Sequence, residues 1–260
     1  MNKKKGKMLL AALFFLLCFQ SIVYGGENIS ALKNEIEELR QEQKALYKEL
    51  KMIRDILLKR GTPTRSQINV RDVEFELGDN PVKGDEFAPL VLVEFSDYQC
   101  SFCARYAKET YPEIFEKYIK TGMLRYAFVD KPLPSHNKAN EAAEAAHCAA
   151  EQGKFHEMHE EMLFNPESID DLTKLASSLY LDIQKFESCM KNKKYSEKVA
   201  ANLSLANKLN VLSVPGFVIA SRDPHNSQKV KGISFIRGAK PFIQFQKEIE
   251  QALEVISKPE

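Results

Sequence analysis

The chain has 260 residues, of which 44% are hydrophobic and 28% charged, and its formal net charge is +1. It carries neither a basic patch nor an acidic tail, which argues against a nucleic-acid-binding function. Residues 68–260, which follow the N-terminal segments described below, are enough for one domain with a sizeable core.

Residues 1–25 have the composition of a secretory signal peptide. Lysines at positions 3, 4, 5 and 7 precede an apolar run from Met8 to Phe19, and small residues follow at Gly25 and Gly26. The apolar run is short for a membrane span, and an uncleaved membrane anchor is the alternative. We therefore expect a periplasmic or otherwise extracytoplasmic protein.

Residues 27–60 predict a coiled coil. Apolar residues alternate at spacings of three and four over four heptads, with one polar member, in the order Ile29, Leu32, Ile36, Leu39, Gln43, Leu46, Leu50, Ile53 and Leu57. A sustained period of 3.5 residues is typical of self-associating helices. We expect a homo-oligomer formed through residues 29–57, with dimer and trimer both open, and one amphipathic helix folded against its own domain as the alternative. Residues 61–67, which contain Gly61 and Pro63, predict a linker.

Residues 68–260 form the predicted catalytic domain, in which two cysteines follow a buried strand. The apolar run Leu90 to Phe95 predicts that strand, and helical spacing continues from Ala104 to Thr121. Cys100 therefore lies at a helix N-terminus, where unpaired N–H groups and the helix dipole lower the pKa of its thiol. We expect an exposed, attacking Cys100 and a resolving Cys103. Half of a zinc site is the alternative, although the chain has no second Cys-x-x-Cys.

Two further features accompany the cysteines. Glu94 lies inside the apolar run, where burial should raise its pKa and make it a suitable proton acceptor near a thiol. A strand residue that reaches a solvated edge is the alternative. Val214 and Pro215 open a second apolar strand far along the chain.

Residues 94–103, residues 142–159 and the pair Val214-Pro215 together resemble the DsbA-like thiol–disulfide oxidoreductases of the thioredoxin superfamily. The resemblance covers roughly residues 82–256. It implies a thioredoxin-like α/β fold with a helical insertion at about residues 135–209. In that family the proline is cis and lies beside the sulfurs, the residue before it binds substrate through its backbone, and a buried acid relays protons. These roles fall on Pro215, Val214 and Glu94.

The dipeptide between the cysteines departs from the strongly oxidising members of that family. Ser101 stands where many relatives have proline, and Phe102 where strong oxidants have histidine. We assign both residues to the substrate-binding surface. The missing imidazole leaves the Cys100 thiolate less stabilised, which favours a weaker oxidant.

The predicted insertion contains the other two cysteines of the mature chain. Cys148 and Cys189 lie on two of its helices, and we expect a structural disulfide between them, as in some members of the family. An exported location favours the bond over the alternative of two buried free thiols. A capping box at residues 168–171 predicts a helix start before Leu172. The histidines of this region, His147, His156 and His159, are expected to pack rather than to bind a metal.

These features predict an exported thiol–disulfide oxidoreductase that acts on cysteine-containing exported proteins and is recycled by an unidentified membrane redox partner. An oligomeric disulfide isomerase or reductase is the preferred interpretation, and a DsbA-type dithiol oxidase is the first alternative. An exported binding module without enzymatic activity, with a structural or metal-binding cysteine pair, is the alternative of another class. We expect no cofactor, no metal and no nucleic-acid partner.

Overall fold

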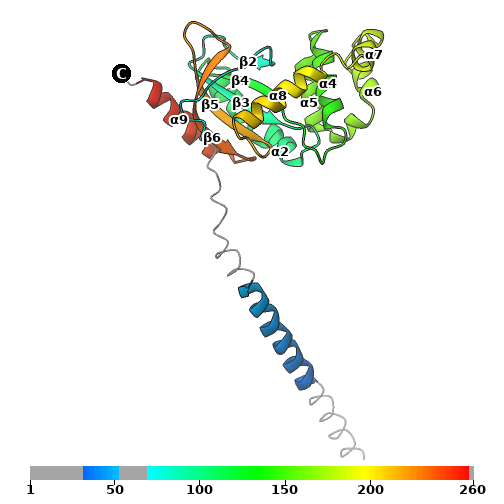
Figure 1. Ribbon diagram of the computed structural model, residues 1–260, viewed down its shortest axis with the longest axis vertical. Coiled ribbons are helices and arrows are strands. Elements are labelled where there is room, and N and C mark those ends of the chain that lie inside the picture. The colour runs from blue at the N-terminus through cyan, green and yellow to red at the C-terminus, as the bar shows by residue number, and fades with distance from the viewer. Residues whose placement is uncertain (1–31, 53–68, 258–260) are drawn as a thin grey trace, which may run out of the picture. The chain divides into compact units, whose positions relative to one another are not determined.

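The computed structural model describes residues 32–52 and 69–257 (Figure 1). The chain divides into two units, residues 1–67 and 68–260, and each is described by itself. The predicted signal peptide, the linker and both ends of the predicted coiled coil lie outside the described residues. In the described part of the chain, no helix has both the length and the apolarity needed to cross a membrane.

The described part of the first unit is a helix over residues 32–52, which confirms the predicted N-terminal helix. All of its residues are exposed. Five apolar members of the heptad pattern have between 43% and 59% of their surface exposed: Leu32, Ile36, Leu39, Leu46 and Leu50. Within the helix itself these residues form one apolar stripe, and its self-association stays a prediction.

The second unit contains a six-stranded mixed sheet with the order β1-β6-β5-β3-β4-β2. β3 lies parallel to β4 and antiparallel to β5, and all its residues are buried, which confirms the predicted strand. At one edge, β1 has only three residues. The strands are β1 (Glu74–Glu76), β2 (Val82–Lys83), β3 (Leu90–Ser96), β4 (Leu124–Asp130), β5 (Gly216–Arg222) and β6 (Lys229–Arg237).

Helices cover both faces of this sheet. α2, α9 and the insertion helices α4 to α7 share one apolar cluster with Leu92 and Tyr126, whereas Ala206 of α8 packs with Val91 and Val93 on the opposite face. The helices are α2 (Ser101–Glu109), α3 (Tyr111–Ile114), α4 (Ala139–Ala150), α5 (Phe155–Phe164), α6 (Leu172–Ser178), α7 (Ile183–Lys191), α8 (Ser196–Lys208) and α9 (Phe242–Ser257), with a π-helix η1 (Phe115–Ile119) and a 3₁₀-helix η2 (Pro166–Asp170). The thioredoxin-like α/β arrangement with its helical insertion is confirmed.

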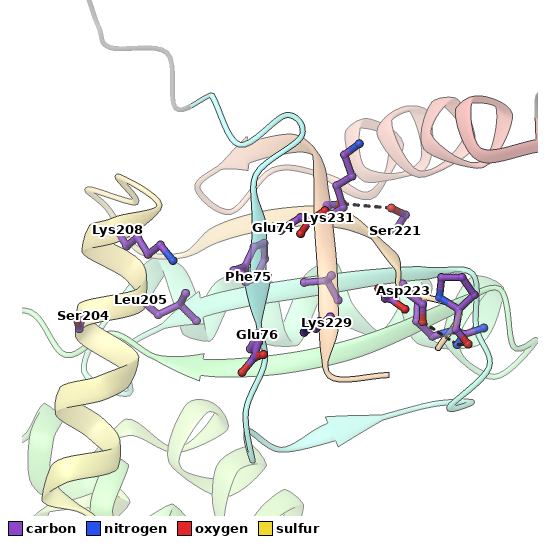
Figure 2. Close-up of a pocket in the computed structure, with 13 residues that line it drawn as sticks. Glu74, Phe75, Glu76, Ser204, Leu205, Lys208, Ser221, Asp223, Lys229 and Lys231 are labelled. Atoms are coloured by element: carbon purple, nitrogen blue, oxygen red, sulfur yellow. Dashed lines mark hydrogen bonds between the residues drawn. The ribbon is translucent and has the colours of Figure 1, made fainter. Parts of the chain in front are cut away.

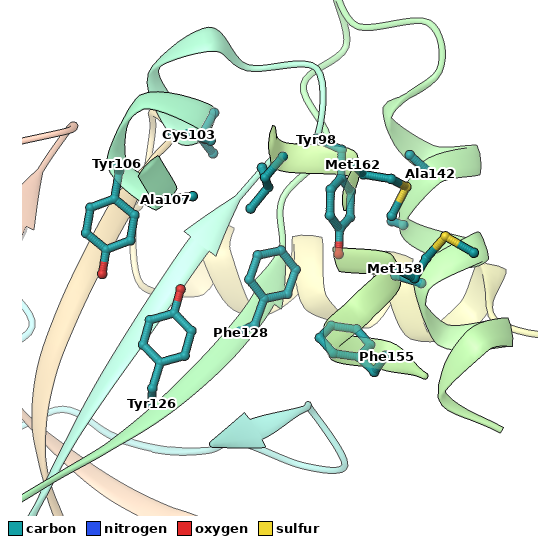
Figure 3. Packing of buried hydrophobic residues seen from close by; sticks show 14 of the residues in the cluster. Tyr98, Cys103, Tyr106, Ala107, Tyr126, Phe128, Ala142, Phe155, Met158 and Met162 are labelled. Carbon is teal, nitrogen blue, oxygen red and sulfur yellow. The ribbon is translucent and has the colours of Figure 1, made fainter. Parts of the chain in front are cut away.

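Aromatic residues and methionines fill the cluster between the sheet and α5. Figure 3 shows Tyr98, Phe128, Phe155, Met158 and Met162 packed together beside β4. Because side chains alternate along a strand, Glu94 points to this same face as Leu92. The larger core therefore lies directly beneath the turn that carries the cysteines.

The single helix expected over residues 104–121 is instead broken. α2 ends at Glu109, α3 begins at Tyr111 with Pro112 in its first turn, and the π-helix follows. Proline has no N–H to donate to the preceding turn, so the ladder of helical hydrogen bonds is interrupted there.

Candidate active site

Cys100 and Cys103 lie at the junction between the end of β3 and the start of α2. Cys100 is the N-cap residue of α2, with extended backbone angles (φ −82°, ψ 113°), and Cys103 lies one turn into the helix. Both are free thiols. Cys100 is 7% exposed and Cys103 0%, so the expectation of an openly exposed Cys100 is wrong, although Cys100 is the more accessible of the two. The turn before the helix and the chain at Val214 account for this partial cover.

The two thiols have opposite shifts in pKa. A hydrogen bond from the Cys103 thiol lowers the pKa of Cys100 to about 6, and the backbone N–H groups of Cys103 and Phe102 add to this effect. Burial raises the pKa of Cys103 well above its ordinary value, and the neighbouring Cys100 and Glu94 charges raise it further. At neutral pH the pair therefore combines a thiolate at Cys100, the more accessible of the two, with a protonated thiol at Cys103.

Val214 and Pro215 reach the cysteines from the other half of the chain. β5 pairs antiparallel with β3, and Gly216 stands opposite Phe95, one residue beyond the cis Val214–Pro215 peptide. The Cys100 thiol donates to the Val214 carbonyl oxygen at 3.8 Å. A side chain at Gly216 would place its Cβ 2.8 Å from the Val211 side chain, so the close approach of this loop requires glycine.

Ser101 and Phe102 form the exposed first turn of α2. The Phe102 side chain is 54% exposed, and the Arg105 guanidinium lies 4.9 Å from the centre of its ring. Arg105 also donates to the Ala239 carbonyl oxygen at 3.3 Å, which ties α2 to the loop before α9. A large apolar side chain is thus held at the surface beside the nucleophilic sulfur.

Glu94 lies in the centre of the sheet and is 1% exposed. The alternative of a solvated edge is therefore wrong. Burial raises the pKa of Glu94 to about 7. The Tyr126 hydroxyl donates to Oε2 of Glu94, whereas Oε1 has no hydrogen-bond partner among the described residues. A carboxyl group that changes charge near neutral pH thus lies close enough to Cys103 to influence its pKa.

Sequence reasoning missed Asp97, a buried carboxylate that shapes the turn before Cys100. It accepts hydrogen bonds from the backbone N–H groups of Gln99 and Leu133, both at 2.7 Å, and lies 2.9 Å from Nδ1 of His136. Its negative charge acts on Cys100 in the direction that raises the pKa of that thiol. An aspartate that bonds the N–H two residues later is an Asx turn, and its position directly after a strand was the signal available.

The insertion contributes a disulfide and several satisfied histidines. Cys148 on α4 and Cys189 on α7 are joined with an S–S distance of 1.99 Å. Nε2 of His147 lies 2.6 Å from Asp130, and Nδ1 of His159 lies 3.1 Å from the Tyr98 hydroxyl. Within residues 32–52 and 69–257, no three histidine, cysteine or acidic side chains are grouped as metal ligands.

A wide depression of about 700 Å³ lies at the β1 edge of the sheet (Figure 2). Phe75, Leu205 and Val230 give it an apolar floor, and lysines and acids from β1, β6 and α8 surround it. None of the candidate site residues lines it. Charges of both signs around the depression select no single class of ligand.

Comparison with known proteins places this geometry in context. The sequence profile described as thioredoxin matches residues 76–236. The structure of alpha-DsbA1 from Wolbachia pipientis superposes with a TM-score of 0.56 and 28% sequence identity, covering 67% of this chain and 90% of that one.

Two curated proteins show the range of sequences that share this domain. A Na(+)/H(+) antiporter NhaA 3 from Salinispora tropica is 30% identical over 156 residues, which are 59% of this chain and 23% of that protein. A putative protein-disulfide oxidoreductase from Rickettsia felis is 24% identical over 156 residues, covering 56% of this chain and 55% of that protein. The chain thus spans about a quarter of the length of the antiporter it matches.

Proposed function

Because this chain belongs to the thioredoxin family, with a DsbA-like domain, we propose that it is a thiol–disulfide oxidoreductase acting on cysteine-containing exported proteins. The observation that carries the proposal is the pair of unlike thiols, an acidic Cys100 and a buried, weakly acidic Cys103. Cys100 also lies against Val214, whose carbonyl oxygen it contacts. In this arrangement the Cys100 sulfur forms the mixed disulfide with the substrate, and the Cys103 sulfur can resolve it.

The exchange runs through a mixed disulfide in either direction. When the protein oxidises a substrate, the substrate thiolate attacks Cys100 Sγ of the Cys100–Cys103 disulfide, and Cys103 leaves with the electron pair and takes up a proton. A second substrate thiolate then attacks the substrate sulfur of the mixed disulfide, which releases the substrate disulfide and the Cys100 thiolate. When the protein reduces a substrate, the Cys100 thiolate attacks the substrate disulfide and Cys103, after losing its proton, resolves the mixed disulfide. Glu94 exchanges this proton with Cys103.

The preferred form of this activity is an oligomeric isomerase or reductase. Two observations support it: the apolar stripe of the helix at residues 32–52, and Phe102 in place of an imidazole that would stabilise the thiolate. Catalytic domains joined through a shared coiled coil present several dithiols at high effective concentration to one misfolded client. The likeness to alpha-DsbA1 favours a dithiol oxidase as the second candidate. Export through residues 1–25 and recycling by a membrane redox partner belong to the same proposal.

Activity on a test protein in a glutathione buffer separates these functions. We expect the full-length chain to restore the native disulfides of a scrambled protein faster than glutathione alone, and Cys100→Ser/Cys103→Ser to lose the effect. Rapid oxidation of a reduced peptide without reshuffling would instead identify an oxidase. Full biological activity of the double variant would contradict both and favour a binding module without enzymatic activity.

A further inference from the structure

Two buried tyrosines, Tyr126 on β4 and Tyr106 on α2, share the space beside Glu94. Tyr126 pairs with Leu92 in the parallel register of β3 and β4, so it lies on the same face of the sheet as Glu94. Its hydroxyl donates to Glu94 Oε2. Figure 3 shows the hydroxyls of Tyr106 and Tyr126 pointing into the same space. Tyr106 is 1% exposed, and its hydroxyl has no partner among the described residues.

A narrow cavity connects these hydroxyls with the side of the domain formed by α5. Its volume of about 20 Å³ is enough for one water molecule. Its lining includes Tyr106, Tyr111 and Tyr126, together with His156 and Glu160 of α5. The Glu160 side chain is 44% exposed, so this wall reaches solvent. A water molecule in the cavity would satisfy the Tyr106 hydroxyl, which is otherwise a buried polar group without a partner.

Resting on the thiol–disulfide exchange proposed above, we propose that Tyr126 transfers protons between Glu94 and solvent through a water molecule held in this cavity. The Cys100 surface is covered whenever a protein substrate is bound there. A route along α5 leaves Glu94 in contact with solvent during that time. Tyr126 acts on the sulfurs only through Glu94.

The proton balance of the step is simple. When Cys103 leaves the disulfide as a thiolate, protonated Glu94 gives it a proton. Tyr126 then gives its hydroxyl proton to Glu94 and takes one from the cavity water, and this water takes one from solvent. When Cys103 attacks a mixed disulfide, each transfer runs in reverse, and the proton leaves to solvent. Tyr126 gains one proton as it gives another, so no tyrosinate accumulates.

The surroundings of Glu94 fit such a neutral relay. The polar and titratable groups that act on it or feel its charge come from β3, the loop before α2, α2, α3 and β4: Ser96, Tyr98, Cys100, Cys103, Tyr106, Tyr111 and Tyr126. Burial raises the pKa of Tyr126 and of Tyr106 well above the ordinary value, so both hydroxyls stay protonated. The Cys100 thiolate is the one group of this set that is charged beside Glu94 at neutral pH. Tyr126 donates to Oε2 of Glu94, and the Ser96 hydroxyl on the same strand also acts on this carboxyl group.

A two-step thiol titration tests the proposal. Reduced full-length protein in a Cys18→Ser background, with the Cys148–Cys189 disulfide intact, is mixed at pH 7 with 5,5′-dithiobis(2-nitrobenzoate). Attack by Cys100 releases one thionitrobenzoate, and attack by Cys103 on the resulting mixed disulfide releases a second. We expect Tyr126→Phe to change the rate of the first release by less than about twofold and to slow the second release about tenfold. A tenfold change is smaller than the full effect of a positioned acid–base group, because Tyr126 acts through Glu94. The solvent deuterium isotope effect on the second release should change in this variant, whereas the isotope effect on the first release should not.

Matched variants distinguish proton transfer from packing. Tyr111→Phe removes a hydroxyl from the same cavity that makes no described hydrogen bond to Glu94, and should leave both releases within about twofold. Tyr106→Phe should slow the second release, because it removes a hydroxyl that holds the water. Glu94→Gln should slow it at least as much as Tyr126→Phe, and adding Tyr126→Phe to Glu94→Gln should slow it no further.

The proposal is overturned if Tyr126→Phe leaves the second release unchanged, slows both releases equally, or slows the second by the same factor in the Glu94→Gln background. If Tyr126→Phe does not fold, an unchanged second release in Tyr106→Phe overturns it. Failure of the proposed function has a different signature, because the unaltered dithiol would then release only one thionitrobenzoate.

Discussion

Cys100 and Cys103 are one helical turn apart, yet their thiols differ sharply in acidity. The largest cause for Cys100 is the hydrogen bond from Cys103, which lowers the pKa of Cys100 to about 6. With Cys18 replaced by serine and the Cys148–Cys189 disulfide intact, we therefore expect iodoacetamide to modify Cys100 and not Cys103, with a rate that rises through a midpoint near pH 6. Peptide mass spectrometry over a pH series measures both the site and the midpoint.

The variants of Cys103 serve as a matched pair for this prediction. Cys103→Ser keeps a hydroxyl donor and should hold the midpoint low, whereas Cys103→Ala removes the donor and should move it upward. Since the pKa of Cys100 is lowered by folding, the thiolate stabilises the reduced fold at high pH, and this contribution is lost as the pH falls through about 6. A midpoint unchanged in Cys103→Ala would show that the helix N-terminus alone sets the acidity.

The charged form of Glu94 destabilises the fold, in contrast to the Cys100 thiolate, because burial raises the pKa of Glu94 to about 7. An unfolded chain releases this proton near pH 4.5, so the buried carboxylate costs stability increasingly as the pH rises from there to about 7. We expect Glu94→Gln to raise the free energy of unfolding by about 3 kcal/mol at pH 8 and to change it little at pH 4. Urea unfolding of the oxidised protein at the two pH values measures the difference.

Glu76→Gln is the control for this prediction, because Glu76 is an exposed residue of β1. It should change the free energy of unfolding equally little at both pH values. A Glu94→Gln difference that does not depend on pH would contradict a carboxyl group with a raised pKa.

At the scale of single residues, the local sequence was enough to identify Cys100, Cys103 and Glu94 as site residues. It was not enough to identify the side chains that contact them. Cys100 and Cys103 are adjacent in sequence to the strand that buries Glu94, so one stretch contained all three. Tyr126 lies on another strand, and its contact with Glu94 depends on the register of β3 against β4, which no local pattern gives. The link from Asp97 to Leu133 likewise depends on how the loop after β4 folds back.

At the scale of elements, the Cys148–Cys189 disulfide ties α4 to α7 inside the insertion. The bond closes a sequence separation of 41 residues, and the chain-entropy model gives it a stabilisation of about 3–4 kcal/mol. We expect Cys148→Ala/Cys189→Ala to lose about this amount in urea unfolding. The two-step reaction of Cys100 and Cys103 with a small disulfide should be retained, because the insertion does not supply either sulfur.

The two outcomes of that experiment test different ideas. A small loss of stability would show that the insertion retains its structure in the unfolded chain or gains little from the bond. Loss of the Cys100 reaction in a variant that still folds would contradict a purely structural role for the disulfide.

Element boundaries were less predictable than the elements themselves. Residues 168–171 have the pattern of a capping box, yet Ser168 lies in the 3₁₀-helix and its hydroxyl has no partner among the described residues. Asp171 caps α6 instead, accepting from the Lys174 N–H at 2.9 Å. Ser168, Asp170 and Asp171 are all residue types that can serve as an N-cap. The packing of Ile169 and Leu172 into the core favours Asp171 as the N-cap of α6. The helical insertion as a whole, by contrast, was expected from the resemblance to the DsbA-like proteins.

At the scale of the whole molecule, the heptad stripe predicts an assembly that one chain cannot show. Leu39 and Leu46 occupy equivalent core positions in two consecutive heptads, on either side of Gln43, and are 58% and 59% exposed. Because two charges at these positions would be buried between helices, we expect Leu39→Asp/Leu46→Asp to convert the oligomer into monomers. Sedimentation of the full-length chain measures the change.

Gln41→Asp/Ala45→Asp is the matched control, since it adds the same two carboxylates to exposed positions of the helix outside the stripe. This variant should keep the oligomer, so that a loss in both variants would point to damage of the helix rather than of the interface. If assembly serves reshuffling, the monomeric variant should lose the rescue of scrambled protein and still oxidise a small dithiol peptide, because that reaction needs one Cys100–Cys103 pair. Equal reshuffling by monomer and oligomer would contradict the isomerase proposal, since a single dithiol would then suffice, and the stripe would serve to position the domain.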